Sequence, residues 1–342
     1  MPVNHTLADA SDLAFKTSFV VYAVALVLFI AYYIRQKAVL EARAELAEAG
    51  ARPDALVRVG GAAEPPARPA GPADGRGTGP DAAGVDRRAA AADRLGGIAE
   101  MALYLGVAVH LASVSLRGLS AHRFPWGNLY EYISIFTLIA MVVAAGVLRR
   151  PGLRVFWPFL ITPVLGLMFY GGTKLYAASQ PVQPALQSFW FPIHVSTVVL
   201  GASIFLISGV SSVLYLVRMR QPRGRETGRL GALARPLPSA RTLDTIAYRT
   251  AIWAFPVFGL GVIFGAIWAE AAWGRFWGWD PKETVSFVTW ILYAGYLHAR
   301  ATSGWRNHMA AWVNVVAFAT MVFNLFFVNM VVSGLHSYAG LN

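Results

Sequence analysis

The chain has 342 residues, of which 56% are hydrophobic and only 14% are charged, and its formal net charge is +11. Soluble domains average about 25% charged residues, so this composition predicts a membrane protein and excludes an ordinary water-soluble fold. The absence of cysteine excludes disulfides, thiolate nucleophiles and Cys-ligated metals. We interpret the positive charge through the loops between apolar runs, and we predict no nucleic-acid partner.

Apolar runs of about 20 residues, long enough to cross a bilayer as helices, recur along the whole chain. We predict eight spans, near residues 14–34, 97–116, 129–148, 155–171, 193–217, 250–270, 285–299 and 309–332. The first run lacks a basic leader and a small-residue cleavage site, so we expect no cleaved signal peptide. The predicted fold class is therefore all-α, a polytopic transmembrane helix bundle of about eight spans.

The basic residues predict the orientation of the bundle. With the loop after the first span placed inside the cell, 23 of the 29 Lys and Arg residues fall on the cytoplasmic side. This asymmetry follows the positive-inside rule. We predict a multi-pass protein of the cell (plasma or inner) membrane, with both termini on the extracytoplasmic side.

Composition divides the chain into three parts. Residues 1–34 form the first transmembrane helix. Residues 35–96 form a cytoplasmic linker, which starts as a helical extension over 35–49 and is largely disordered because it then has few large apolar residues. Residues 97–342 form a seven-span core.

An aromatic run, WGRFWGWDPKET (273–284), is the densest motif of the core. Trp273, Trp277 and Trp279 offer rigid apolar faces, and Gly278 between them permits close approach of a flat ligand. The alternative interpretation is an aromatic belt at the membrane surface.

The end of this run has the chemistry of a helix start. Asp280 is a suitable N-cap, Pro281 suits the first helical position, and Glu283 completes a capping box. Lys282 and Arg275 add positive charge beside the tryptophans.

Four histidines lie in or beside spans. His194 begins the fifth span and His336 follows the eighth, so both share the predicted membrane face of the tryptophan run. Imidazole is the usual neutral axial ligand of haem iron, and a pair at helix ends beside an aromatic shelf would hold a porphyrin from both faces. The alternative for each is an inert interfacial histidine. His298, near the inner end of the seventh span, and His110, within the second, remain further candidates.

The run from Trp273 to Thr284 resembles the tryptophan-rich WWD signature of haem-handling membrane proteins. Among these the chain is most similar to the CcsA/ResC family of cytochrome c synthesis proteins, often labelled CcsB in actinobacteria. The resemblance covers about residues 97–342. It includes the segments PWGNLYEY, FPIHVS, WILYAGYLHAR and VNMVVSGLHSY.

This resemblance implies the membrane component of a system II cytochrome c synthase. Such a protein relays haem b across the membrane, presents it at the external WWD surface and promotes thioether attachment to the CxxCH motif of apocytochrome c. This holocytochrome-c synthase (haem lyase) activity implies a ResB-type membrane partner and a separate thiol-reducing protein. By position, His194 and His336 would be external axial ligands. His298 would be a ligand of an inner haem site, completed by the partner.

Physical chemistry adds roles for the neighbours of these ligands. The tryptophan faces would bind the porphyrin plane, and Lys282 or Arg275 would pair with the propionates. Asp280 serves mainly as a helix cap. We assign no catalytic residue beyond positioning of the haem. Two other functions stay open at this point: a permease for haem or another small solute without attachment activity, and a structural subunit of a respiratory complex.

Overall fold

The computed structural model describes residues 2–51, 81–302, 305, 308–332 and 334–336. The predicted all-α helix bundle is confirmed within these residues. The elements in chain order are α1 (His5–Ala51), α2 (Ala82–Ser120), α3 (Leu129–Val147), η1 (Pro151–Phe156), α4 (Trp157–Lys174), η2 (Pro184–Leu186), α5 (Trp190–Arg220), α6 (Gly228–Ala234), α7 (Ala240–Trp273), α8 (Pro281–Ala301), α9 (His308–Phe323) and the π-helical turn η3 (Asn324–Val328).

Seven of the described helical segments are long and apolar enough to cross a membrane. Each overlaps one predicted span, with the predictions 129–148 and 309–332 running past Val147 and Val328, and the remaining predicted span, 285–299, lies in α8. Helix α8 has 21 residues, so it is roughly 30 Å long and has the reach of a span. Its polar residues concentrate near its two ends, where Lys282 and Glu283 begin it and His298 and Arg300 close it.

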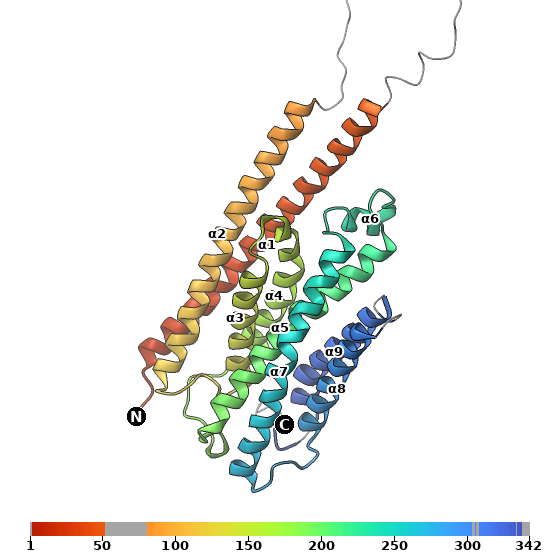
Figure 1. The fold of residues 1–342 in the computed structure, drawn as a ribbon. Helices are drawn as coiled ribbons and strands as arrows, with labels where there is room; N and C mark the ends of the chain where they lie inside the picture. The colour runs from red at the N-terminus through yellow and green to blue at the C-terminus, as the bar shows by residue number, and fades with distance from the viewer. Residues whose placement is uncertain (1, 52–80, 303–304, 306–307, 333, 337–342) are drawn as a thin grey trace, which may run out of the picture.

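The helices form a bundle with two pairs at its sides and a central layer (Figure 1). Helices α1 and α2 run side by side and extend beyond the rest of the bundle, while α8 and α9 pair on the opposite side. Helices α3 and α5 are central. In their most apolar stretches 61% and 67% of the residues are buried inside the protein, against at most 44% in the other spans.

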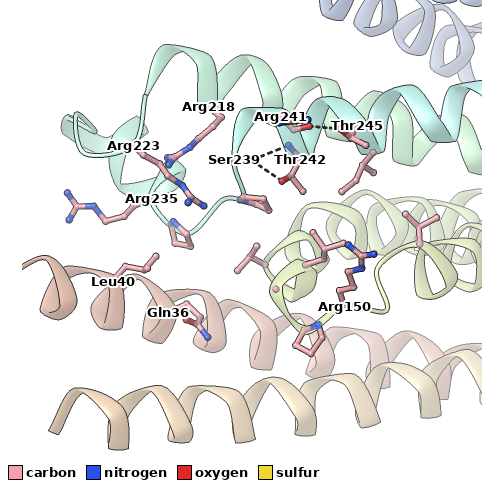
Figure 2. Close-up of a pocket in the computed structure, with 18 of the residues that line it drawn as sticks. Gln36, Leu40, Arg150, Arg218, Arg223, Arg235, Ser239, Arg241, Thr242 and Thr245 are labelled. Atoms are coloured by element: carbon pink, nitrogen blue, oxygen red, sulfur yellow. Dashed lines mark hydrogen bonds between the residues drawn. The ribbon is translucent and has the colours of Figure 1, made fainter. Parts of the chain in front are cut away.

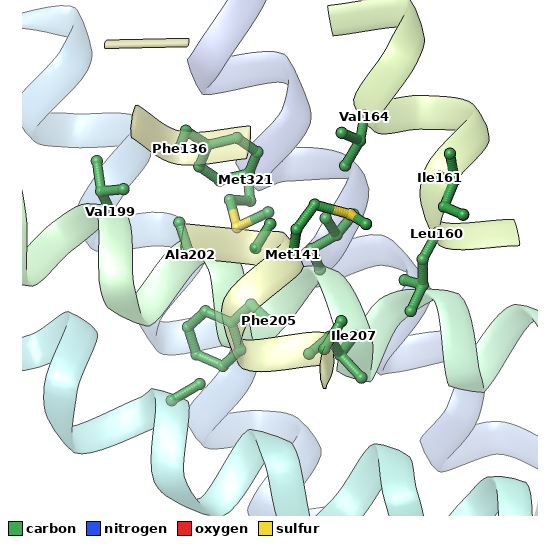
Figure 3. Packing of buried hydrophobic residues seen from close by; sticks show 14 of the residues in the cluster. Phe136, Met141, Leu160, Ile161, Val164, Val199, Ala202, Phe205, Ile207 and Met321 are labelled. Carbon is green, nitrogen blue, oxygen red and sulfur yellow. The ribbon is translucent and has the colours of Figure 1, made fainter. Parts of the chain in front are cut away.

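The central layer consists of apolar side chains from helices far apart in the sequence (Figure 3). Phe136 and Met141 of α3, Phe205 of α5 and Met321 of α9 are all buried there. Lipid tails are as apolar as these side chains, so close packing contributes more than exclusion from water to holding the helices together.

Helix α2 begins at Ala82, whereas we predicted a largely disordered linker up to residue 96. The Asp81 side chain accepts a hydrogen bond from the N–H of Gly84 at 2.6 Å and caps a helix that starts at Ala82. Alanine-rich sequence favours a helix even where few large apolar residues are available. Val85 of this turn packs on Val39 of α1, so the helical extension of the first span is paired. The segment 52–80 lies outside the described residues.

A buried carboxylate fixes the start of α3. Glu131 is 1% exposed and pairs with Arg117 of α2 at 3.0 Å and with Arg123 at 2.8 Å. It also accepts from the N–H of Gly127 at 2.7 Å. Asn128 caps the helix by accepting from the N–H of Glu131 at 2.9 Å. The PWGNLYEY segment is therefore tied to the end of α2.

The bundle has two chemically different ends. We call the end where α7 stops and α5 and α8 begin the site end, and the end where α5 stops and α7 begins the basic end. The N-terminus lies near the site end (Figure 1). The side of the membrane that each end faces stays a prediction.

Candidate functional site

The tryptophan run forms the connection between α7 and α8. Helix α7 stops at Trp273, and Gly274 follows in a left-handed conformation with φ of 69°, its N–H donating to the carbonyl of Glu270 at 2.8 Å. Residues with a Cβ are strained at this φ, so glycine suits the helix end here. Residues 275–280 then cross to α8 without regular structure.

The predicted capping box at the start of α8 is confirmed. The Asp280 side chain accepts from the backbone N–H of Lys282 at 3.1 Å. In return, Glu283 accepts from the N–H of Asp280 at 3.2 Å. Pro281 occupies the first turn, where its missing N–H costs nothing.

Glu283 also holds the tryptophan loop. Its carboxylate accepts from the N–H of Gly278 at 3.0 Å and from Arg275 at 3.1 Å, and Arg275 lies over the Trp273 ring at 5.6 Å. A Cβ at Gly278 would lie 2.1 Å from the guanidinium carbon of Arg275, so this ion pair requires a glycine. Arg275, which we predicted as a propionate partner, is thus engaged within the loop.

Asp280 has a second role, which is to hold His336. Its carboxylate accepts from His336 Nδ1 at 2.8 Å and from the N–H of Leu335 at 2.9 Å. The segment after α9 is thereby attached to the start of α8. Because an ionised carboxylate only accepts, the proton is on Nδ1 and the imidazole lone pair is on Nε2.

The protonation of this pair follows from burial and hydrogen bonding. Burial lowers the pKa of His336 below its usual range, although the bond to Asp280 acts in the opposite direction. Burial alone would raise the pKa of Asp280, but the hydrogen bond from His336 and two backbone N–H groups bring it down to about 2. At neutral pH the pair is therefore a neutral imidazole on a carboxylate.

His194 is fixed by the neighbouring helix α7. Its Nδ1 donates to the carbonyl of Gly261 at 2.7 Å, so the lone pair of this imidazole also lies on Nε2. A Cβ at Gly265 would come within 2.6 Å of the imidazole Cε1. The glycine at that position leaves the space that the ring occupies.

The two imidazoles meet at Trp268. His194 stacks on the indole, with ring centroids 5.7 Å apart and planes at 12°, and His336 meets it edge-on at 5.6 Å. The indole donates from Nε1 to the carbonyl of Ala185 at 3.1 Å. Trp273 lies 5.0 Å from His336. The structure therefore brings three of the predicted residues around an indole outside the predicted set.

Small cavities open beside the imidazoles. One of about 100 Å³ is lined by both histidines, Trp268 and Lys282, and a second of about 60 Å³ by both histidines, Trp277 and Lys282. A water molecule takes about 30 Å³, so each cavity holds only a few waters. A porphyrin would have to displace side chains to enter.

Lys282 supplies the positive charge of this region. Its Nζ donates to Oδ1 of Asn329 and lies 5.8 Å from the centre of the Tyr132 ring. Because Lys282 lines both cavities, its ammonium group is placed to meet an anionic substituent of a ligand.

Trp277 and Trp279 form the outer part of the tryptophan run. Trp277 lines the smaller cavity and meets Trp279 edge-on at 5.8 Å. Trp279 is 68% exposed, with a φ of 57° that is uncommon for a residue other than glycine. Trp279 and Gly278 line neither of the two cavities and therefore form the outer rim of the site.

His298 and His110 lie apart from this cluster. His298 is exposed near the other end of α8, roughly 24 Å along the helix from Lys282. His110 is fully buried in α2, with Nε2 3.2 Å from Ser134 Oγ and its ring against Tyr22. Neither imidazole lines the two cavities beside His194 and His336.

Sequence reasoning did not select Trp268, Asn329 and Tyr132. Trp268 falls within an apolar run and reads as a packing residue. Asn329 is a polar residue in the last apolar run, where burial is costly, and this was a usable signal. Tyr132 lies in the PWGNLYEY segment, whose contact with α8 no local pattern predicts.

The comparisons with known proteins agree with the resemblance. The family model described as cytochrome C assembly protein matches residues 98–336. The cytochrome c biogenesis protein CcsA of Guillardia theta is 32% identical over 241 residues, covering 66% of this chain and 80% of that protein. The CcsA of Gloeobacter violaceus is 30% identical over 290 residues, covering 69% and 85%.

Among solved structures, one matches this chain with a TM-score of 0.47 and a sequence identity of 16%. It is the cytochrome c haem lyase CcmF, and the match covers 90% of this chain but only 46% of that one.

The family match extends over more than half of the chain and includes both site-end histidines. Together with the seven helices that are able to span a bilayer, it identifies a multi-pass membrane protein. The chain belongs to the cytochrome c assembly protein family.

Proposed function

We propose that this chain is the membrane component of a system II cytochrome c synthase, which holds haem b at the site end and promotes its attachment to apocytochrome c. Membership of the family places the chain in cytochrome c biogenesis. One observation carries the finer proposal. His194 and His336 converge on a single indole, and each has its Nδ1 engaged so that its lone pair is on Nε2.

The donor set fits haem as a substrate. Two neutral imidazoles are a ligand pair that gives a six-coordinate, low-spin b-type haem. The acceptors behind them, a backbone carbonyl and the Asp280 carboxylate, orient the rings and raise their basicity. Lys282 supplies a cation for a propionate, and Trp268 and Trp273 supply apolar ring faces.

The attachment step requires little from the protein beyond positioning. Each thiol of CxxCH adds across a vinyl double bond, so that an S–C bond forms and the thiol hydrogen ends on the adjacent vinyl carbon. Nothing leaves and no net oxidation occurs. Holding two vinyl groups against two thiols converts an encounter between molecules into an effectively intramolecular reaction. The chain contains no cysteine, so both thiols come from the apocytochrome.

Relay of haem to the site end is proposed to start at His298. This imidazole is exposed at the far end of the same helix whose first turns form the site. A ligand on an outer helix surface suits a haem shared with a second membrane protein, which would be the ResB-type partner. On this view, α8 joins an inner and an outer haem position in the cell membrane.

Haem content tests the proposal directly. The protein purified from haem-replete cells, with its partner, is expected to carry six-coordinate low-spin b-type haem. His194→Gly and His336→Gly are expected to abolish holocytochrome c formation, with partial recovery when imidazole is added. His122→Gly is the matched control, because His122 is exposed and has a φ of 53° that glycine adopts easily.

The possible results separate the candidate functions. A colourless wild-type preparation, or unchanged holocytochrome c in both site variants, would refute the haem site. Retained haem with no thioether product in the wild type would favour a permease without attachment activity. Haem that neither site variant affects would favour a structural haem-protein subunit.

A further inference from the structure

A large cavity lies at the basic end, and none of its lining residues lines the cavities of the candidate haem site. Figure 2 shows its lining. Its volume is about 1670 Å³. Gln36 and Leu40 of α1 line one side, Arg150 at the start of η1 lines the floor, and Arg218 and Arg223 line the other side. The cavity therefore separates the α1–α2 pair from the end of α5 and the start of α7.

The lining of this cavity is strongly basic. It contains six arginines and only two carboxylates, namely Arg150, Arg218, Arg223, Arg235, Arg241, Arg249, Asp93 and Glu226. Glu226 is neutralised by Arg218 at 2.8 Å. Arg235 pairs with Glu41 of α1. Within the described part of the chain, Arg150, Arg223 and Arg241 form no ion pair. The cavity thus keeps an excess of positive charge, which attracts an anion.

One of these arginines has an unfilled hydrogen-bonding position in the interior. Arg218 is 3% exposed, and its Nη1 donates to Glu226 and to the carbonyl of Ala234 at 3.0 Å. Its buried Nη2 has no hydrogen-bond partner among the described residues. Leaving such a donor unpaired is costly, so this position indicates a missing acceptor. Arg218 lines the cavity but its Nη2 has almost no exposed surface, so an anionic oxygen in the cavity would supply this acceptor after a shift of the guanidinium group.

The same cavity has an apolar side formed by residues of the membrane-spanning helices. Val143, Val147, Ile204 and Ile246 line it, and Trp253 at its edge is 72% exposed on the surface of a predicted span. A cationic region at helix ends suits the anionic headgroup of a phospholipid, and the apolar wall that continues from it suits the acyl chains. No histidine, cysteine or methionine occurs in the described lining, so the cavity offers none of the usual axial ligands of haem iron.

We propose that this basic cavity binds the headgroup of an anionic phospholipid. The phosphate oxygens accept from Arg218 and Arg223, Arg150 adds positive charge from another part of the cavity wall, and the acyl chains follow the apolar wall past Trp253. The bound lipid bridges the α1–α2 pair to the α5–α7 pair, where the protein itself provides the Arg235–Glu41 ion pair and a hydrogen bond from Tyr33 to the carbonyl of Leu233.

Thermal unfolding of the full-length protein in neutral detergent tests this site. Short-chain phosphatidylglycerol is titrated against phosphatidylcholine of the same chain length, with inorganic phosphate and hemin as separate arms. We expect a saturable rise in Tm with phosphatidylglycerol alone. Each arginine near an anionic headgroup contributes roughly a five-fold change in affinity, so Arg150→Gln with Arg223→Gln weakens binding on the order of 25-fold.

The control removes equal charge from the connection between α5 and α7, where Arg223 also lies. Arg225 and Arg229 are exposed and do not line the cavity, so Arg225→Gln with Arg229→Gln is expected to leave the apparent Kd unchanged. An equal response to phosphatidylcholine, or an equal loss in both double variants, would overturn the proposal. Saturation by phosphate alone would indicate a plain anion site. A Tm rise with hemin instead of lipid, lost in Arg150→Gln with Arg223→Gln, would assign the cavity to haem.

Discussion

The sharpest test of the candidate haem site is the substitution Asp280→Asn. Asparagine caps helices as well as aspartate does, so α8 is expected to start at the same residue. The amide, however, has one accepting oxygen where the carboxylate has two. Both carboxylate oxygens of Asp280 accept hydrogen bonds. Oδ1 accepts from His336 Nδ1 and from the backbone N–H of Lys282, and Oδ2 accepts from the backbone N–H of Leu335.

Either orientation of the amide disturbs His336. If the oxygen faces His336, the NH₂ group meets the N–H of Leu335, donor against donor. If the NH₂ group faces His336, the imidazole accepts on Nδ1 and its proton moves to Nε2, which then has no lone pair for iron. Loss of such an outer hydrogen bond typically costs 10- to 100-fold in metal affinity, or about 1.4 to 2.8 kcal/mol.

The assay is titration of the haem-free protein with hemin, followed by the low-spin Soret spectrum. Asp280→Asn is expected to raise the hemin Kd roughly 10- to 100-fold. Asp244→Asn is the matched control, because it breaks the ion pair with Arg300, 2.9 Å long, at the basic end and leaves the site intact. Hemin affinity in Asp280→Asn equal to that of the wild type would refute the role of Asp280 in fixing the ligand.

Three further predictions follow from single contacts. Gly265→Ala places a methyl group against the His194 imidazole and is expected to lower haem occupancy in purified protein, whereas Gly295→Ala, with open space around it, should not. Lys282→Met is expected to weaken binding of hemin but not of hemin dimethyl ester, and equal losses for both ligands would argue against a propionate contact. Asn314→Ala removes a buried amide that donates to two serine hydroxyls of α5, so the free energy of unfolding should fall by about 1 kcal/mol in denaturant titrations; an unchanged value would show that this contact carries no net stability.

Much of the fold could be predicted from the sequence because membrane helices have a strong local signal. Apolar length located the spans, and the Asp280–Glu283 spacing located the start of α8 to the residue. The early start of α2 was not predicted, because apolar content was used to identify structure there. In that region an aspartate cap and alanine-rich sequence suffice for a helix that packs on α1.

The site shows a different limit of sequence reasoning. His194 and His336 lie far apart in the sequence, and they were paired because the predicted topology put both on the membrane face of the tryptophan run and the family resemblance implied a shared role. The group that brings them into contact, Trp268, has no distinguishing local pattern, since aromatic residues are common in spans. The second role of Asp280 depends on a contact between residues 56 positions apart, which no capping pattern contains.

The two imidazoles differ in what must move for each to withdraw. His194 lies in the first turns of α5, which packs closely against Gly261 of α7, and its Nδ1 donates to the Gly261 carbonyl, so its withdrawal has to break a contact between two long helices. His336 follows α9 on a short segment attached through Asp280. Under the proposed function, a finished product would therefore leave most easily on the His336 side, where a few hydrogen bonds give way while the bundle stays in place.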